Sequence, residues 1–368
     1  MAAHYLVTGG AGFIGRHLCT ELLEQGHRVR VLDSLIDQVH GDAPPRLPPD
    51  VEVLHGDVRD IASVDRALAG VAGVFHLAAE VGVGQSMYEI ARYVGANDLG
   101  TAVLLERLAS TPVRRLVVAS SMSVYGEGLY ADAAGRRHDN VQRIVREGSS
   151  QWDPVAPDCG ALHPVPTDES KPVDLASVYA VTKFVQERNC LIVGRAYGIE
   201  AVALRLFNVF GPGQALSNPY TGVLANFGAR LLHGQPPLVF EDGRQKRDFV
   251  HVRDVARAFR LAMDVPQAAG QVINIGSGRS YEIAQIANML ADAMDVPHLA
   301  PQLLGKARAG DIRHNFADIG RARAVLGYAP EYPLEQTIGE AAAWIRGAQA
   351  TDRGEDAWRQ LEARGLMA

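Results

Sequence analysis

A glycine-rich turn between a strand and a helix at the start of the chain limits the fold more than any other feature. The apolar run Tyr5–Val7 leads directly into Thr8-Gly-Gly-Ala-Gly-Phe-Ile-Gly15, and residues 13–25 have the apolar periodicity of a helix. A second strand-like run, Arg28–Leu32, ends at Asp33. Strand, turn, helix, strand and terminal acid predict a dinucleotide-binding βαβ unit, and with it a doubly wound parallel α/β sheet.

The residues of this unit each have a chemical reason to bind a dinucleotide, although an ordinary glycine-rich turn would share part of the pattern. The glycines allow a tight turn close to a pyrophosphate, and the helix N-terminus offers free N–H groups to the phosphates. The carboxylate of Asp33 would accept hydrogen bonds from ribose hydroxyls and repel a 2′-phosphate, so NAD is expected rather than NADP. The expected cofactor contacts in this unit are Gly9, Gly12, Phe13, Ile14, Gly15 and Asp33.

Strand and helix patterns continue to alternate beyond this unit. The further strands are expected at Val51–Leu54, Val74–Leu77, Arg115–Ala119, Ala201–Leu206 and Val272–Ile275. In a parallel sheet the carboxyl ends of the strands meet at one edge, and ligand sites lie there. Asp33, Asp57, Ala78 and Ser121 all fall at such ends, so this edge is the expected place of the site.

Charge and cysteine content argue against several classes of function. A net charge of −6 and a pI near 6.1 provide no basic field, so nucleic acid is not expected as the main partner. Cys19, Cys159 and Cys190 are too few and too scattered for a disulfide framework or a four-cysteine zinc site. Cys159 with His163 lacks a second pair, so no metal is expected. No apolar run has the length of a membrane span and no signal peptide precedes the first strand, so a cytoplasmic protein is expected.

The segment Tyr179-Ala-Val-Thr-Lys183 is the strongest sign of catalysis. Residues four apart on a helix share a face, so the phenol and the ammonium can approach one site. A fixed positive charge lowers the pKa of a neighbouring phenol, which equips the pair to move a proton on and off a sugar or alcohol hydroxyl. A tyrosine at a helix edge and a solvated lysine would produce the same spacing.

Several further stretches, taken in order with these two, resemble the extended short-chain dehydrogenase/reductase family. They are Asp57-Val58, His76–Ala79, Ser120–Gly126, Arg205–Gly213, Arg247–Val252 and Asn274–Gly278. More narrowly, residues 4–346 resemble the NAD-dependent epimerase/dehydratase branch, which acts on nucleotide-diphosphate sugars. The resemblance implies a Rossmann domain that binds NAD, a smaller and mostly helical C-terminal substrate domain, and a homodimer.

The resemblance also implies how the two domains share the chain. The expected NAD-binding domain is 1–207 with 247–275, and the expected nucleotide-sugar-binding domain is 208–246 with 276–346. Residues 127–172 form a long insertion rich in Gly, Pro and charge, with a candidate short helix near Asn140–Glu147. Such an insertion is either a lid over the site or a surface lobe. Residues 347–368 are polar and are expected to form an exposed tail.

Carried onto this sequence, the family pattern assigns three catalytic residues. Ser121 would hydrogen-bond the reacting sugar hydroxyl and Tyr179 would take its proton, while NAD accepts the hydride. Lys183 would hold the nicotinamide ribose and lower the pKa of Tyr179. The further cofactor contacts implied are Asp57, Val58, Leu77, Ala78, Asn97, Tyr179 and Lys183. The substrate contacts implied are Ser121, Ser123, Asn208, Arg247 and Arg308, for which surface hydrogen bonds and salt bridges are the alternative.

The two residues after Ser121 separate the reactions of this branch. The 4,6-dehydratases carry an Asp-Glu pair there, and the sugar-acid decarboxylases carry a Glu at the second position. Met122 and Ser123 can supply neither acid nor base, so the resemblance implies a 4-epimerase, which oxidises C4, rotates the 4-keto sugar and returns the hydride to its other face. A net 4-ketosugar reductase, a 4,6-dehydratase and a non-catalytic NAD-binding regulator stay open as alternatives.

Two stretches bear on which sugar is bound. Residues 79–86 and 121–128, together with the long insertion, look more like epimerases of deoxyhexose nucleotides, such as the dTDP-L-rhamnose 4-epimerases, than like plain UDP-glucose 4-epimerases. Val81 also stands where some UDP-galactose epimerases place a lysine against the cofactor. The resemblance therefore favours a deoxyhexose nucleotide without fixing the sugar or the base.

Overall fold

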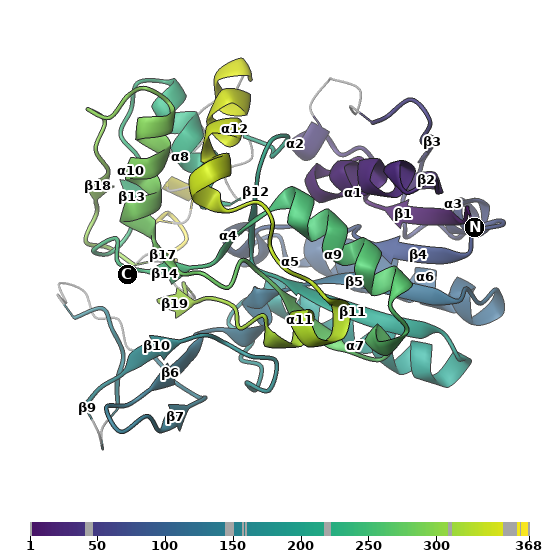
Figure 1. Cartoon of the computed structure of the whole chain (residues 1–368), viewed down its shortest axis with the longest axis horizontal. Helices are drawn as coiled ribbons and strands as arrows, with labels where there is room; N and C mark the ends of the chain where they lie inside the picture. The colour runs from purple at the N-terminus through teal and green to yellow at the C-terminus, as the bar shows by residue number, and fades with distance from the viewer. Residues whose placement is uncertain are drawn as a thin grey trace.

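A seven-stranded parallel sheet forms the centre of the molecule (Figure 1). The computed structural model describes residues 2–40, 47–143, 151–156, 158, 160–216, 222–307, 311–348, 359–360 and 362–366. In spatial order the strands are β16 (Val272–Ile275), β11 (Glu200–Leu206), β5 (Arg115–Ser121), β4 (Gly73–His76), β1 (His4–Thr8), β2 (Arg28–Asp33) and β3 (Glu52–His55). Each neighbouring pair is parallel, which confirms the predicted doubly wound sheet.

Helices cover both faces of this sheet. On one face α1 (Phe13–Glu24) packs against α9 (Val252–Asp264). On the other face lie α3 (Ile61–Leu68), α6 (Gly100–Ser110) and α7 (Val178–Tyr197). Parallel strands covered on both faces are nearly continuous apolar runs, which explains why the sequence pattern located them.

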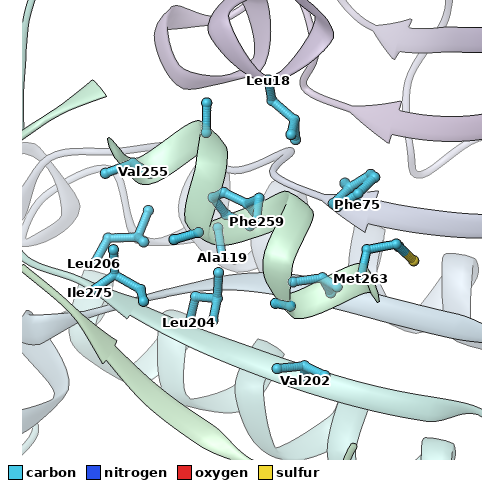
Figure 2. Close-up of a cluster of buried hydrophobic side chains, with 14 of the residues drawn as sticks. Leu18, Phe75, Ala119, Val202, Leu204, Leu206, Val255, Phe259, Met263 and Ile275 are labelled. Atoms are coloured by element: carbon cyan, nitrogen blue, oxygen red, sulfur yellow. The ribbon is translucent and has the colours of Figure 1, made fainter. Parts of the chain in front are cut away.

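Phe259 of α9 lies within the larger of the two cores beside the sheet (Figure 2). Its ring meets the ring of Phe75 on β4 edge-on, with centroids 6.3 Å apart, and both side chains are fully buried. Leu204 and Leu206 of β11 belong to the same core. Burial of each large apolar side chain contributes about 1.5–3 kcal/mol, so α9 is held firmly against the strands that carry the site.

The strand order reverses between β1 and β4, and doubly wound sheets bind ligands at such a switch point. The glycine turn that follows β1 lies there. Gly9 has φ of +69°, and a Cβ at this position would lie 2.7 Å from the backbone nitrogen of Ala78. Only glycine tolerates this approach, so the turn and the segment after β4 form one surface.

A second hydrophobic cluster lies beside the sheet, at the upper left of Figure 1. It is formed mainly by α8 (Val223–Leu232), α10 (Ile283–Ala293) and α12 (Leu334–Gly347). The sequences of residues 221–233 and 281–294 are helix-like and predict α8 and α10. The third helix was missed, although the buried residues of α12 follow the helical apolar period: Leu334, Ile338, Ala341, Ala342 and Ile345.

The insertion at residues 127–172 contains short strands and lies at the lower left of Figure 1. One small sheet consists of β10 (His163–Val165), β6 (Leu129–Ala131) and β7 (Arg137–His138), and a second pairs β8 (Val155–Ala156) with β9 (Gly160–Ala161). The helix expected over residues 140–147 is wrong for 140–143, which are not helical, and 144–147 lie outside the described residues.

The remaining described elements are short. They are α2 (Asp37–His40), α4 (Val83–Ser86), α5 (Ile90–Tyr93), the π-helix η1 (Val94–Leu99), the 3₁₀ helices η2 (Met122–Tyr125) and η3 (Pro266–Ala268), α11 (Gly320–Leu326), β12 (Asn208–Phe210), β13 (Leu238–Val239), β14 (Lys246–Arg247), β15 (Phe249–His251), β17 (Tyr281–Glu282), β18 (Gln302–Leu303) and β19 (His314–Asn315). The helix expected in two pieces near 86–109 is continuous from α5 through η1 to α6.

Most of the expected tail at 347–368 lies outside the described residues. A search of the described helices finds none that is long and apolar enough to cross a membrane.

Candidate active site

A cavity of about 390 Å³ opens at the carboxyl ends of the sheet strands. The expected residues that line it are Gly9, Gly12, Phe13, Ile14, Gly15, Asp33, Asp57, Val58, Leu77, Ala78, Ser121, Tyr179, Lys183 and Asn208. Asn97, Ser123 and Arg247 lie outside its described lining, and Arg308 lies outside the described residues. The fold therefore brings most of the predicted site residues to one place.

The glycine turn and the start of α1 form one end of the cavity. Gly12 is the N-cap of α1 and has no side chain with which to satisfy the first N–H groups of the helix. Gly12, Phe13, Ile14 and Gly15 all line the cavity, so the positive end of the helix dipole faces it. Such a helix start binds phosphate groups.

Asp33 is held in place at the end of β2. Its carboxylate accepts hydrogen bonds from the backbone N–H groups of Ala11 (3.0 Å) and Leu35 (2.9 Å), and lies 3.6 Å from Nε2 of His40. The backbone of Leu35 has φ of +51°, a left-handed conformation. A carboxylate offers about four acceptor positions, so capacity for ribose hydroxyls is left.

Two further acids of the described lining are paired with arginines. Arg59 donates to both carboxylate oxygens of Asp57, at 3.0 and 2.5 Å, and this hydrogen bonding holds the pKa of Asp57 below its ordinary value. Arg92 donates to both oxygens of Glu80 at 2.9 Å. Among the described residues, no group of three or more His, Cys, Asp or Glu side chains is arranged to hold a metal ion.

Ser121 and Tyr179 are brought together from β5 and α7. Ser121 is the N-cap of η2, and its Oγ accepts hydrogen bonds from the backbone N–H of Ser123 (3.2 Å) and from Oγ of Ser123 (2.9 Å). Because these bonds use both lone pairs of Oγ, the hydroxyl proton of Ser121 is free to be donated to another acceptor. The N–H of Tyr179 donates to Oγ of Ser86 at 3.0 Å, and Ser177, two residues earlier, is the N-cap of the helix.

Burial sets the protonation of Tyr179 and Lys183. It raises the pKa of Tyr179 to about 12, and a hydrogen bond with Ser121 offsets only part of that rise. It lowers the pKa of Lys183 to about 8, which leaves the amine mostly charged at neutral pH. From the sequence, Lys183 was expected to lower the pKa of Tyr179. The net shift of the phenol is upward here, because the loss of solvent outweighs the hydrogen bond.

Asn97 is fully buried in η1 and stabilises the wall of the cavity. Its Oδ1 accepts the backbone N–H of Glu80 at 2.7 Å, and its Nδ2 donates to the carbonyl of Glu80 at 3.1 Å and to Oγ1 of Thr182 at 2.9 Å. One amide thus fixes the segment after β4 against the helix that carries Tyr179.

Arg247 and Asn208 lie on the side of the second hydrophobic cluster. The guanidinium of Arg247 donates to the backbone carbonyls of Arg313 (2.9 Å) and Ile312. Asn208 lines the cavity, and its Nδ2 donates to the backbone carbonyl of Asp248 at 3.0 Å. Of the two, only Asn208 belongs to the described lining.

Several residues that line the cavity were not identified as site residues by sequence reasoning. They are Phe210, Gln214, Gly222, Val223, Leu224 and Phe249. These residues come from β12, the turn after it, the start of α8 and β15, segments separated along the chain. No spacing marks them as a group, and only the fold brings them together.

Ion pairs built around two arginines with buried side chains join the insertion to the segments around β14 and β19. Arg313 donates to Oε2 of Glu241 at 2.8 Å and to Oδ1 of Asp153 at 2.7 Å. Arg143 pairs with Glu241, and its Nε lies 3.5 Å from Oε1 of Glu127. Glu127, in turn, accepts the backbone N–H of Arg313 at 2.6 Å. These five side chains, here called the clasp, connect residues far apart in the sequence.

Comparison with known proteins identifies related enzymes. The profile of the NAD dependent epimerase/dehydratase family matches residues 5–276. A dTDP-L-rhamnose 4-epimerase of Burkholderia thailandensis is 36% identical over 355 residues, which is 95% of this chain and 96% of that protein. The solved structure of MoeE5 in complex with UDP-glucuronic acid and NAD has a TM-score of 0.74 and 31% identity, covering 94% of this chain and 99% of that one. A UDP-glucose 4-epimerase of Thermotoga maritima with UDP-glucose has a TM-score of 0.75 and 29% identity, with the same coverage.

Proposed function

Because the chain belongs to the NAD-dependent epimerase/dehydratase family, we propose that it is a 4-epimerase of a nucleotide-activated sugar. The proposal rests on one observation: the acidic side chains of the described cavity lining are all paired with basic side chains. Met122 and Ser123 follow Ser121, and each acid of the described lining faces a basic side chain: Asp33, Asp57 and Glu80. Elimination of a hydroxyl needs an additional free acid or base, whereas oxidation and reduction at C4 do not. The site is therefore equipped for epimerisation.

The proposed cofactor is NAD, which suits the end of the cavity at the glycine turn. The uncapped start of α1 fits a pyrophosphate, and Asp33 fits ribose hydroxyls while opposing a 2′-phosphate. NAD bound there would supply the capacity to accept a hydride from C4 of the sugar and to give it back. The related structure of MoeE5 with NAD and UDP-glucuronic acid supports this assignment.

Three side chains of this protein would handle the hydroxyl at C4. With a sugar bound, Ser121 would donate its proton to the hydroxyl oxygen at C4 in place of the phenol oxygen of Tyr179, which orients that hydroxyl toward Tyr179. Tyr179 removes the hydroxyl proton during oxidation and returns it during reduction. Because burial raises the pKa of Tyr179 to about 12, the phenolate needs a nearby positive charge, and the ammonium of Lys183, which lines the same cavity, is proposed to provide it. The 4-keto sugar rotates between the two hydride transfers, which inverts C4.

The proposed substrate class is a nucleotide-diphosphate deoxyhexose. The similarity to a dTDP-L-rhamnose 4-epimerase over nearly the whole chain supports it. Asn208 lines the cavity and is proposed to contact the substrate directly. Ser123, Arg247 and Arg308 are proposed as further substrate contacts on the strength of the motif resemblance.

Product analysis separates this proposal from its alternatives. Purified protein should interconvert dTDP-L-rhamnose and its 4-epimer without added reductant, as followed by NMR, with UDP-glucose as a parallel substrate. Absorbance in the reduced-nicotinamide band should show no net change. Stoichiometric consumption of NADH when a 4-keto sugar nucleotide is supplied would instead identify a 4-ketosugar reductase, and release of a 4-keto-6-deoxy sugar from UDP-glucose would identify a dehydratase.

We also propose that the protein is a homodimer. Large apolar side chains are exposed on the helix that runs through α5, η1 and α6 and on α7: Ile90, Val94, Leu99, Val181 and Ile192. Pairing of these two helices with a second copy would cover such residues. Light scattering at micromolar concentration should give the dimer mass, and Leu99→Asp should give the monomer mass. A monomeric wild-type protein would contradict this proposal.

The division of the chain into an NAD-binding domain (1–207 with 247–275) and a substrate domain (208–246 with 276–346) is likewise proposed. The separate cluster around α8, α10 and α12 supports it. A cytoplasmic location is proposed because the described cysteines, Cys19 and Cys190, are buried free thiols, as is usual in a reducing compartment.

A further inference from the structure

Five buried polar side chains connect the lysine of the site to the first strand of the sheet. They are Lys183 and Gln186 on α7, Thr101 on α6, His76 on β4 and Thr8 on β1. None is more than 3% exposed. Buried polar groups need hydrogen-bond partners, so the way these groups are paired fixes how each one is oriented.

Thr101 determines the direction of the hydrogen bonds at the centre of this chain of residues. Its hydroxyl donates its only proton to the backbone carbonyl of Asn97 at 2.5 Å. Its oxygen must therefore accept from Nε2 of Gln186 (2.8 Å) and from Nε2 of His76 (2.9 Å). His76 thus carries its single proton on Nε2, and its Nδ1 accepts the hydroxyl proton of Thr8 at 2.7 Å.

The same constraint orients the amide of Gln186. Since its N–H groups face Thr101, it can present only its oxygen to Lys183, and Nζ of Lys183 donates to that oxygen at 2.6 Å. If the amide were rotated, an N–H group would face an ammonium, and two donors would be left without acceptors in a buried place. Gln186 therefore holds one defined proton of the ammonium.

We propose that Gln186 is a positioning residue of the reaction, which holds the ammonium of Lys183 in one orientation beside Tyr179 and the cofactor. The proposal rests on the proposed function and adds to it a residue outside the described lining of the cavity. An ammonium has three protons. With one proton held by Gln186, the other two N–H bonds have fixed directions. They can donate to the ribose hydroxyls of the cofactor, and the ammonium can stabilise the phenolate of Tyr179.

Other charged groups also act on Lys183 and set the background for a test. Burial disfavours its charged form, whereas the carboxylates of Glu187 on α7 and Asp98 on η1 favour it; the thiol of Cys190 on α7 is neutral, because burial raises its pKa to about 12. His76 on β4 is neutral, because burial lowers its pKa to about 3. Gln186 is uncharged. Replacing it with Glu would add a negative charge next to the ammonium, and replacing it with Leu would remove a hydrogen-bond acceptor.

The test compares Gln186→Leu and Gln186→Glu with a matched control, Gln245→Leu. Gln245 is also buried, and its Nε2 donates to the carbonyl of Phe240 at 2.9 Å. Gln186→Leu should lower kcat by roughly 10–100-fold with a smaller change in KM, because a field that acts in the transition state is lost. Gln186→Glu should shift the alkaline limb of the kcat profile to higher pH. The control should change neither quantity.

A second readout does not depend on activity. The chain has four lysines, Lys171, Lys183, Lys246 and Lys306, so competitive acetylation followed by mass spectrometry can titrate Lys183 individually. The pKa of Lys183 should rise in the order Gln186→Leu, wild type, Gln186→Glu. Equal titration in all three folded proteins, as judged by thermal melting, would overturn the proposal. If that order holds in a protein that epimerises no sugar, the positioning role stands and the proposed function fails.

Discussion

Tyr179 is the residue whose hydroxyl the proposed reaction uses twice. Tyr179→Phe should lower kcat by about 10²–10⁴-fold, because proton transfer in both directions is lost. Tyr197→Phe is the matched control, since Tyr197 ends the same helix and is 54% exposed. The control should keep wild-type kcat. Measured turnover of Tyr179→Phe within threefold of wild type would remove Tyr179 from the mechanism.

We expect Asp33 to be the residue that selects between NAD and NADP. Asp33→Asn removes the negative charge and keeps one oxygen, so it can still accept the N–H of Ala11 or that of Leu35, which bond to different oxygens of the carboxylate. The ratio of the Kd for NADP to the Kd for NAD should therefore fall by about tenfold or more, since 1.4 kcal/mol of lost repulsion corresponds to a factor of ten. Fluorescence titration with both reduced cofactors measures it, and an unchanged ratio would place the selectivity elsewhere.

The insertion is an element that the clasp holds against the segments around β14 and β19. Arg313 is 1% exposed, and Arg313→Met would leave part of the charge of Glu241 and Asp242 without a partner. Breaking a buried ion pair in this way costs about 3–5 kcal/mol. Arg346→Met is the control, because Arg346 forms an exposed pair with Asp295 that should contribute at most about 1 kcal/mol.

Denaturant unfolding measures both variants. The expected result is a large loss of stability for Arg313→Met and almost none for Arg346→Met. Equal effects would show that the clasp does not fasten the insertion, and the interpretation of residues 127–172 as a mobile lid would gain support.

At the level of elements, the sequence predicted the helices and strands that have a regular pattern of apolar residues. The central strands β1, β4, β5, β11 and β16 are nearly continuous apolar runs, and the buried residues of α9 recur at helical spacing. The two-residue strands such as β14 were missed, because a pair of residues has no period and its pairing partners are distant. The clasp was missed for the same reason, since its members are separated by up to 186 residues.

Protonation of buried histidines couples the stability of the whole molecule to pH. Nδ1 of His314 accepts the backbone N–H of Lys246, and burial lowers the pKa of His314 from 6.5 to about 4. Between these values the unfolded chain binds more protons, so this contribution to stability is lost as the pH falls from about 6.5 to about 4. Asp248, whose pKa burial raises to about 6, acts in the opposite sense.

The variant His314→Asn isolates the contribution of one histidine. Its unfolding free energy should lie below that of wild type at about pH 7, and the difference should shrink toward about pH 4.5. Urea unfolding at both pH values measures this. A difference that stays constant with pH would show that His314 does not resist protonation in the folded protein.

For the whole molecule, the motifs predicted the cavity residues that are proposed to bind the dinucleotide and left much of the remaining lining unassigned. Gly9 to Asp33 could be predicted because the phosphate and ribose impose one local chain geometry. Phe210, Gln214 and Phe249 could not, because a sugar nucleotide can be held by many different surfaces. The raised pKa of Tyr179 also depends on burial, which the sequence did not show.

The central claim is that the hydride removed from C4 returns to the same carbon. The most direct measurement uses substrate carrying deuterium at C4, incubated with the enzyme in ordinary water and analysed by NMR and mass spectrometry. The account predicts that the 4-epimer retains deuterium at C4, and that a parallel reaction in heavy water places none at C4 or C5. Loss of deuterium from C4 to solvent, or solvent deuterium at C5, would contradict the account.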